Sequence, residues 1–502
     1  MNEIKNQQPI NYRNILLKSV SLIAYAFVFI SLILITSASF VHYQLAYLVY
    51  LIPLLLITLL IYLYKKPFWG IITLVFLLPF HAFLWMTIRN HFGLTGDQSF
   101  WIAFWKEALI IIIILVIISK SIIQKKLPFK IITLDWLIFI LFILGGLSIL
   151  YGTKNLSQGL WGLRTDFEFF LTYFIARSII RNKYQLKILF ITILGSGFLV
   201  VIFGILQTYY WLPDFLTRFG YTLNAWTPNG PLQAYQTVDN LIRIISTFSG
   251  AIQLGPYLAI LILLALSLAL FIKNKLIKVF LVLFSVICLF PLYYTFTRSA
   301  WLGLIVGLFV LFLIIIKDKI NLSHKRIISL LLVIIFLCLL GFGSYVFFKS
   351  NILYEQTFFN KFFYHGSSTF GHTQGIIESL KIIKDNPLGL GLGKSGLVTL
   401  RFNQRFLSEN WYLQITTEMG VLALIIFIAI MIIFIRLIYL LYRDGKDLFI
   451  KGLSLGTLLS FICFSVVGFF LHAWGDNTVV ALIFWILAGG LIEYHILNKN
   501  SL

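Results

Sequence analysis

Charged residues are scarce in this sequence. Of its 502 residues, 11% are charged and 60% are apolar, whereas soluble domains have about 25% charged and about 45–50% apolar residues. This shortage of charge excludes a soluble globular domain. Apolar runs of about 20 residues recur along the chain, and each can cross a bilayer as a helix. The period-2 alternation of a membrane β-barrel is missing, so we predict an all-α, polytopic helical membrane protein.

Cysteine and metal-ligand patterns are also scarce. Cys288, Cys338 and Cys463 stand singly inside apolar runs, which excludes a disulfide framework and a thiolate metal site. The eight histidines are scattered, and the sequence has no HExxH motif or carboxylate cluster. Because these motifs are the usual sequence signals of a bound metal, we expect neither a metal nor a cofactor.

Acidic residues are few: 18 Asp and Glu stand against 39 Lys and Arg, for a net charge of +21. The cations form short clusters between apolar runs, which is typical of a membrane protein obeying the positive-inside rule rather than of a nucleic-acid binder. We place about fourteen transmembrane spans near residues 18–38, 43–64, 68–88, 100–119, 132–151, 161–180, 188–208, 248–271, 279–296, 299–316, 327–347, 419–442, 452–472 and 477–495.

The basic clusters also set the orientation. Junctions after even-numbered spans carry Lys65–Lys66, Lys125–Lys126 and Arg181, so these junctions and both termini are predicted to be cytoplasmic. Residues 349–420 then form one large extracytoplasmic loop carrying short helices, and residues 209–246 form a second, shorter outer loop. The first apolar run is too long for a signal-peptide core and a second span follows at once, so we interpret it as a retained first helix, with a cleaved signal peptide as the alternative. We expect residues 1–502 to be a single polytopic membrane domain.

Charges inside predicted spans need partners, because charge is costly in lipid. Arg164 and Glu168 are i, i+4 neighbours that can neutralise each other, and the alternative is that Arg164 contacts substrate. Lys106 and Glu107 are adjacent on a helix and point about 100° apart, so we expect them to pair with another helix and not with each other. Asp135 is expected to be solvated near the inner surface.

Two arginines lie at the predicted outer surface, where the positive-inside rule disfavours cations. Arg243 precedes the eighth span, and Arg298 lies in the tight turn Thr295-Phe296-Thr297-Arg298-Ser299. A planar guanidinium binds phosphate through two hydrogen bonds. We therefore expect a clamp for a lipid-linked diphosphate, with ordinary lipid-headgroup contact as the alternative.

The outer loop holds three further patterns. Thr373–Asp385 has the spacing of an amphipathic helix, which can lie on the membrane as a lid or pack against its neighbours. Residues 387–396 alternate glycine with other residues, which favours close approach of the backbone to a partner but is neither a P-loop nor a dinucleotide fingerprint.

The third pattern is the polar and aromatic run Ser408–Gln414, which supplies most of the candidate site residues. A partly desolvated Glu409 would have a raised pKa and can accept a proton. Asn410 can orient a sugar hydroxyl or this acid, and Trp411 and Tyr412 can stack on a sugar face. The alternative for both rings is a place at the membrane interface.

Together these motifs resemble the O-antigen ligase and O-antigen polymerase superfamily. The resemblance spans residues 240–440, which would be the ligase/polymerase-like core. It rests on Arg243 with the Ser-Thr-Phe that follows, on Thr297-Arg298-Ser299, on Asn386-Pro387-Leu388-Gly389-Leu390-Gly391, and on Glu409-Asn410-Trp411-Tyr412-Leu413-Gln414 with Gly420.

The resemblance implies an integral-membrane glycosyltransferase of the cytoplasmic membrane that uses an undecaprenyl-diphosphate-linked glycan and works on the outer face. Arg243 and Arg298 would hold the donor diphosphate, His372 would be a secondary donor contact, and Glu409 would be the base of a metal-independent, inverting transfer. Ligases typically carry a His-Asn pair where this chain has Glu409, so the pattern favours an O-antigen, capsule or exopolysaccharide polymerase. The acceptor would be a glycan or lipid-linked glycan.

Three alternatives stay open. One is ligase-type transfer to a terminal acceptor. Another is a flippase for lipid-linked oligosaccharides, which should show two related halves and cations deep in a cavity. The last is a scaffold or interaction protein.

Overall fold

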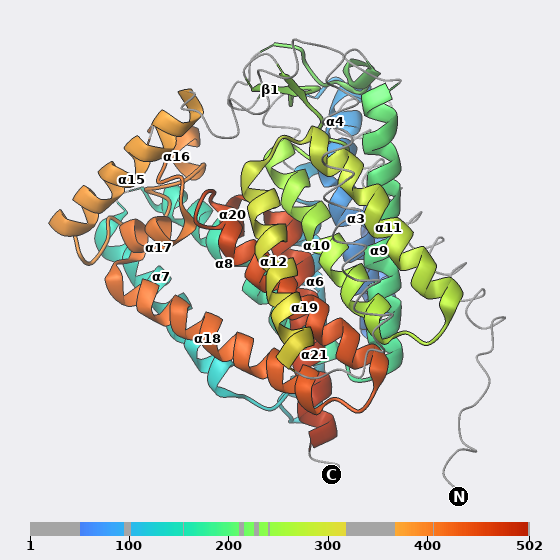
Figure 1. Cartoon of the computed structure of the whole chain (residues 1–502). Coiled ribbons are helices and arrows are strands. Elements are labelled where there is room, and N and C mark those ends of the chain that lie inside the picture. The colour runs from blue at the N-terminus through green and yellow to red at the C-terminus, as the bar shows by residue number, and fades with distance from the viewer. Residues whose placement is uncertain are drawn as a thin grey trace, which may run out of the picture.

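A computed structural model describes residues 51–94, 102–153, 155–209, 215–224, 230–238, 241–317, 367–404 and 406–499. Within these residues the chain is nearly all helical, with one antiparallel pair of short strands (Figure 1). The elements are α2 (Leu51–Lys65), α3 (Pro67–Leu77), η2 (Leu78–Phe80), α4 (His81–His91), α6 (Trp105–Gln124), α7 (Thr133–Gly152), α8 (Leu156–Ile179), α9 (Lys183–Tyr209), η3 (Phe215–Phe219), β1 (Gln236–Val238), β2 (Leu241–Arg243), α10 (Ala251–Phe271), α11 (Lys275–Tyr294), α12 (Arg298–Lys317), α15 (Ser367–Asp385), α16 (Val398–Arg401), α17 (Trp411–Met419), α18 (Val421–Asp444), α19 (Leu448–Val467), α20 (Ala473–Asp476) and α21 (Thr478–Lys499).

The predicted spans agree with these helices wherever the structure describes the chain. Among the residues that the structure describes, ten helices are long and apolar enough to cross a membrane, so the protein is an all-α, multi-pass membrane protein. The span predicted at 161–180 is α8, which carries four charged residues and is not one of the ten. The span predicted at 43–64 is described only from residue 51, as α2, which is not one of the ten. The spans predicted at 18–38 and 327–347 lie outside the described residues, and the total of fourteen stays a prediction.

Local sequence signals set several helix starts. Pro67 stands in the first turn of α3, where its missing N–H costs no hydrogen bond. The side chains of Asn274 and Asp447 accept hydrogen bonds from backbone N–H groups in the first turns of α11 and α19. These caps satisfy donors that a helix start would otherwise leave unpaired.

Three helices form the interior. In their most apolar stretches 89% of α10, 83% of α19 and 78% of α21 is buried, against 28% of α6 and α18. Gly452 and Gly456 let α19 lie close to α10, since a Cβ at either glycine would meet the Cα of Leu268 or Leu264 at 3.0 Å. The helices around this interior present apolar side chains outward, as expected for lipid contact.

A buried ionic cluster joins α6 to α8. Lys106 Nζ lies 2.6 Å from Glu107 Oε1 and 2.7 Å from Glu168 Oε1, and Arg164 pairs with Glu107. The expectation that Lys106 and Glu107 do not pair is wrong, because the flexible lysine side chain reaches back over its neighbour. The expectation that each seeks another helix is confirmed. Two cations face two carboxylates, so the cluster is neutral.

A second buried cluster joins the start of α7 to the C-terminal ends of α8 and α21. Arg177 is fully buried; it pairs with Asp135 and lies 3.0 Å from Glu493 Oε2. Asp135 also accepts a hydrogen bond from the hydroxyl of Tyr173 at 2.8 Å. The expectation of a solvated Asp135 is therefore wrong, because the chain supplies a buried arginine 42 residues away that its sequence position does not reveal.

Candidate functional site

The first part of the site is an arginine pair. Arg243 ends β2 and donates from Nε to the carbonyl oxygen of Thr295 at 2.6 Å and from Nη2 to Thr297 Oγ1 at 3.0 Å. Both acceptors lie in the turn between α11 and α12, and Arg298 begins α12. Burial, with a smaller contribution from Arg298, lowers the pKa of Arg243 to about 10. The structure thus brings the two predicted clamp arginines together, and Arg243 stays cationic at neutral pH.

Arg243 keeps donors for a ligand. Nη1 of Arg243 makes no hydrogen bond within the described residues, and Nη2 uses one of its two hydrogens on Thr297. The Nη1–Nη2 edge can therefore donate two parallel hydrogen bonds to an anion. Arg298 is exposed at the start of α12, where a helix favours an anion. The pair is suited to a phosphate or diphosphate.

The second part of the site is a turn that holds Glu409. The backbone N–H of Glu409 donates to Nε2 of His472 at 2.9 Å, and Nδ1 of His472 lies 3.1 Å from Asp476 Oδ2. Both contacts are made when neutral His472 carries its proton on Nδ1. Glu409 has a left-handed backbone, with φ of 52°, a conformation that a non-glycine residue keeps only when its surroundings hold it.

His472 and Asp476 are site residues that sequence reasoning missed. Burial lowers the pKa of His472, but Asp476, Glu409 and Asp166 together raise it more, so its pKa lies above the usual value. The pair is four residues apart, which places both side chains on one side of a helical turn. That spacing was the available signal, but it does not reveal the contact with Glu409, 63 residues away.

The start of α10 joins the two parts. Thr297 Oγ1 donates to the carbonyl oxygen of Ala251 at 3.0 Å. On the other side, Gln253 Nε2 donates to the carbonyl oxygen of Asp476 at 3.1 Å. A cavity of about 160 Å³ lies beside this junction, and its lining includes Gln253 and Asp476. The arginine pair and the Glu409 turn are therefore built around the same first turn of α10, and Figure 1 shows α20 between α17 and α10.

The neighbours of Glu409 have structural positions. Asn410 caps α17, accepting from the N–H groups of Tyr412 and Leu413 at 2.9 and 3.0 Å. Trp411 is 1% exposed and packs edge-on against Phe169. The hydroxyl of Tyr412 donates to the carbonyl oxygen of Ser465 at 2.8 Å. A ring that is 1% exposed offers no face to a sugar in this structure, so Trp411 is part of the packed interior.

The alternating glycines fit between two backbones. On one side, the N–H groups of Leu390 and Gly391 donate to the carbonyl oxygens of Thr417 and Glu418 at 2.7 and 2.9 Å. On the other side, a Cβ at Gly393, where φ is 78°, would lie 2.4 Å from the carbonyl oxygen of Gln158 in α8. The expectation of close backbone approach is confirmed, and the glycine-rich segment ties α17 to the start of α8.

The amphipathic helix predicted at Thr373–Asp385 is confirmed as part of α15. A Cβ at Gly375 would lie 2.4 Å from the carbonyl oxygen of Leu407 and 3.5 Å from Glu409 Cγ, so α15 passes over the Glu409 turn. Ile377 and Leu380 are 62% and 55% exposed, which fits contact with a membrane surface. His372 stands in α15 one turn before Gly375, and the prediction for its side chain lies outside the described residues.

Arg164 lies apart from the arginine pair in its contacts. It pairs with Glu107, and its guanidinium lies 4.7 Å from the ring centroid of Trp161. Arg401 of α16 stacks on the same ring at 4.1 Å. Arg164 is 27% exposed in its side chain, so it remains reachable. It pairs with Glu107 in place of the predicted Glu168.

Part of this chain matches a known protein family. The fold defines a multi-pass helical membrane protein, and its candidate site holds an arginine pair and a carboxylate that are linked through the first turn of α10. A family model described as O-antigen ligase matches residues 283–428. The match covers Arg298 and Glu409 and begins after Arg243. This match supports the resemblance to the O-antigen ligase and polymerase superfamily over the matched region. No curated protein matches the chain.

Proposed function

We propose that this protein transfers a glycan from undecaprenyl diphosphate to a hydroxyl of a glycan or lipid-linked glycan on the outer face of the cytoplasmic membrane. The observation that carries the proposal is the shared first turn of α10. On one side this turn accepts a hydrogen bond from Thr297, whose hydroxyl in turn accepts one from Arg243. On the other side it donates a hydrogen bond to the backbone of Asp476. The side chain of Asp476 pairs with His472, and His472 accepts a hydrogen bond from the backbone of Glu409. These hydrogen bonds support a site in which Arg243 and Arg298 bind the diphosphate and Glu409 accepts the proton.

The proposed step is a single displacement. An acceptor hydroxyl oxygen forms a bond to the anomeric carbon while the bond from that carbon to the diphosphate oxygen breaks, and its electron pair leaves with the diphosphate. The hydroxyl proton passes to the carboxylate of Glu409. Arg243 and Arg298 stabilise the negative charge that grows on the leaving diphosphate. Attack opposite the leaving group inverts the anomeric carbon.

The surrounding residues position these groups. His472 fixes the backbone of Glu409, and Asp476 fixes the ring of His472, so both act through Glu409. Asn410 and Tyr412 hold the start of α17, directly after the base. His372 and Arg164 are proposed as secondary contacts for the glycan or its diphosphate, because α15 passes over Glu409 and Arg164 lies partly exposed beside Arg401.

Polymerisation is favoured over ligation because a carboxylate, Glu409, stands where ligases typically carry histidine. The nearby His472 comes from a different hairpin. The two reactions differ in product: a polymerase gives a ladder of chain lengths from one repeat unit, whereas a ligase adds a finished glycan once. Purified protein incubated with a lipid-linked repeat unit, followed by gel analysis, distinguishes them.

The experiment for the proposal replaces each arginine of the pair. Arg243→Ala and Arg298→Ala should each lower product formation by purified, reconstituted protein at least a hundredfold, since each removes a charged contact to the leaving group. Arg218→Ala is the matched control, because Arg218 is an exposed arginine on η3 in the predicted outer loop. Near-normal product from both site variants would overturn the diphosphate clamp.

The transport alternative makes a different prediction in cells. A missing flippase leaves repeat units facing the cytoplasm, whereas a missing transferase leaves them facing outward. Labelling the lipid-linked repeat units of deletion cells with a membrane-impermeant reagent separates the two. Unlabelled, inward-facing units would favour transport.

A further inference from the structure

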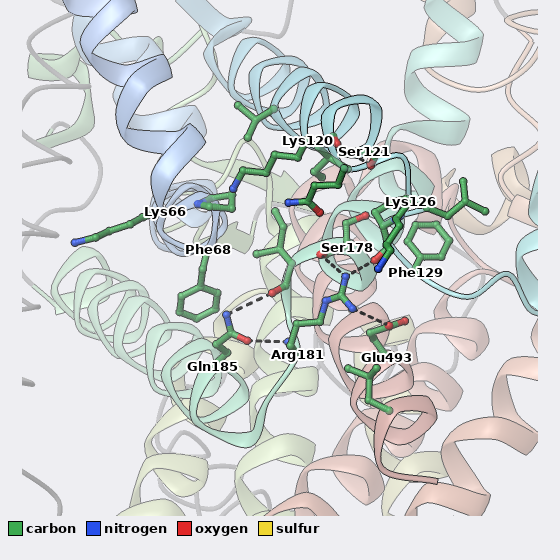
Figure 2. A pocket seen from close by; sticks show the side chains of 18 of the residues that line it. Lys66, Phe68, Lys120, Ser121, Lys126, Phe129, Ser178, Arg181, Gln185 and Glu493 are labelled. Carbon is green, nitrogen blue, oxygen red and sulfur yellow. Dashed lines mark hydrogen bonds and ion pairs between the residues drawn. The ribbon is translucent and has the colours of Figure 1, made fainter. Parts of the chain in front are cut away.

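A basic cavity lies at the C-terminal ends of α8 and α21, two helices whose N-terminal ends lie next to parts of the candidate site. α8 begins beside Gly393 and α21 begins beside Asp476, and the cavity lies where both helices end, together with the end of α6 and the α2–α3 junction (Figure 2). Its volume is about 930 Å³, near the upper end of the range of about 300–1,000 Å³ for ligand sites. The charged residues that line it are Lys65, Lys66, Lys120, Lys126, Lys130, Arg181 and Glu493.

The cavity has excess positive charge. Its one carboxylate, Glu493, is paired with buried Arg177 at 3.0 Å and lies 3.6 Å from Arg181. The five lysines of the lining form no ion pair within the described residues. Figure 2 shows Lys120 reaching from α6 toward the α2–α3 junction, and its Nζ lies 5.1 Å from the ring centroid of Tyr64. The lysines therefore remain available to an anion.

The wall of the cavity is fixed in place. Arg177 donates from Nη2 to the carbonyl oxygen of Lys130 at 2.7 Å and stacks on the ring of Phe129 at 4.5 Å. Arg181 donates to the carbonyl oxygen of Pro128. Buried Arg177 thus holds the α6–α7 connection in place. Lys126 and Lys130, which belong to this connection, line the cavity without any rearrangement of the backbone.

The rest of the lining is largely apolar, including Phe68, Trp69, Ile117, Leu127 and Phe129. A small inorganic anion would contact only the basic residues of this lining. A lipid phosphate would contact the basic residues with its headgroup and the apolar residues with its hydrocarbon chains. Basic pockets between helix ends at the cytoplasmic surface are known to bind anionic headgroups. The clusters at Lys65–Lys66, Lys126 and Arg181 all belong to junctions that the positive-inside pattern assigns to the cytoplasm.

We propose that this cavity binds the phosphate headgroup of an anionic membrane lipid, with its lysines on the phosphate and its aromatic wall on the first carbons of the chains. The inference stands apart from glycan transfer, because it concerns other residues at the other ends of the helices. Two lipids supply this chemistry, a phospholipid such as phosphatidylglycerol and a polyprenyl phosphate.

The test is native mass spectrometry of the purified full chain with three probes: phosphatidylglycerol, undecaprenyl phosphate and the zwitterionic phosphatidylcholine. Wild type should bind at least one anionic lipid more than tenfold tighter than phosphatidylcholine. Lys120→Gln/Lys126→Gln should weaken that binding on the order of 30-fold, from about a factor of five for each lysine near a membrane surface. Lys66→Gln alone should weaken it about fivefold.

The matched control is Lys273→Gln/Lys275→Gln, a pair of exposed lysines at the α10–α11 junction outside the cavity. It should keep wild-type lipid binding. Equal loss in both double variants, or equal binding of anionic and zwitterionic lipid, would overturn the site. The anionic lipid whose binding is weakened in Lys120→Gln/Lys126→Gln is the natural occupant of the cavity. Inorganic phosphate binding as tightly as the lipids would overturn the lipid assignment.

Discussion

The backbone N–H of Glu409 donates to Nε2 of His472 at 2.9 Å across 63 residues of sequence. This contact requires that Nε2 of His472 carries no proton. A protonated His472 carries a hydrogen on Nε2, which then faces the N–H of Glu409 as a second donor. The left-handed backbone of Glu409 loses its hydrogen bond when His472 gains a proton.

Activity should therefore fall as the pH is lowered through the pKa of His472, which lies above the usual value of about 6.5. Asp476→Asn removes the carboxylate that contributes most to raising this pKa, so the acid limb of the kcat/KM profile should move to lower pH. The measurement is a pH–rate profile of both proteins. An acid limb at the same pH in wild type and Asp476→Asn would show that His472 does not set it.

Thr297 gives a test of how Arg243 is held. Thr297→Val removes the hydroxyl that accepts from Arg243 Nη2 and donates to Ala251. A hydrogen bond to a charged group contributes about 1.5–3 kcal/mol, so kcat/KM should fall about tenfold or more. Thr297→Ser keeps the hydroxyl and should retain activity. Thr208→Val, on α9, is the control for the substitution itself; equal losses at both positions would contradict a specific role.

The glycine-rich segment gives a stability test. Gly393→Ala places a Cβ 2.4 Å from the carbonyl oxygen of Gln158 at a left-handed backbone, so unfolding should become about 1–3 kcal/mol easier. Gly146→Ala is the control, because a Cβ there meets nothing within 4 Å. Thermal unfolding in detergent compares the two. A Gly393→Ala protein as stable as Gly146→Ala would mean that the segment is not held between the two backbones.

The buried cluster of α6 and α8 gives a second stability test. Lys106→Met leaves Glu168 buried without its 2.7 Å partner, which should cost about 3–5 kcal/mol. Lys106→Met/Glu168→Leu removes both charges and should recover much of the folded yield, measured by fluorescence-detected size-exclusion chromatography. Lys275→Met, at an exposed position, should have no effect. A double variant less stable than Lys106→Met would contradict the pairing.

The sequence predicted the helices well because long apolar runs between basic clusters leave a membrane chain few other structures. It also made Arg243, Arg298 and Glu409 candidate site residues, since charges in unusual places stand out against such a background, and their roles stay predictions. It could not show that Asn410 caps α17 or that Trp411 packs inside, because the same residue types also suit sugar binding. The contact between His472 and Glu409 depends on how two segments 63 residues apart pack together, and this packing cannot be predicted from a single sequence.

In the proposed reaction, Glu409 takes the proton while the arginine pair holds the donor. The most direct test measures donor affinity and turnover of purified Glu409→Gln together. We expect donor binding within twofold of wild type and turnover at least a hundredfold lower, since positioned general bases contribute about 10²–10⁴-fold. Wild-type turnover by Glu409→Gln would contradict the claim.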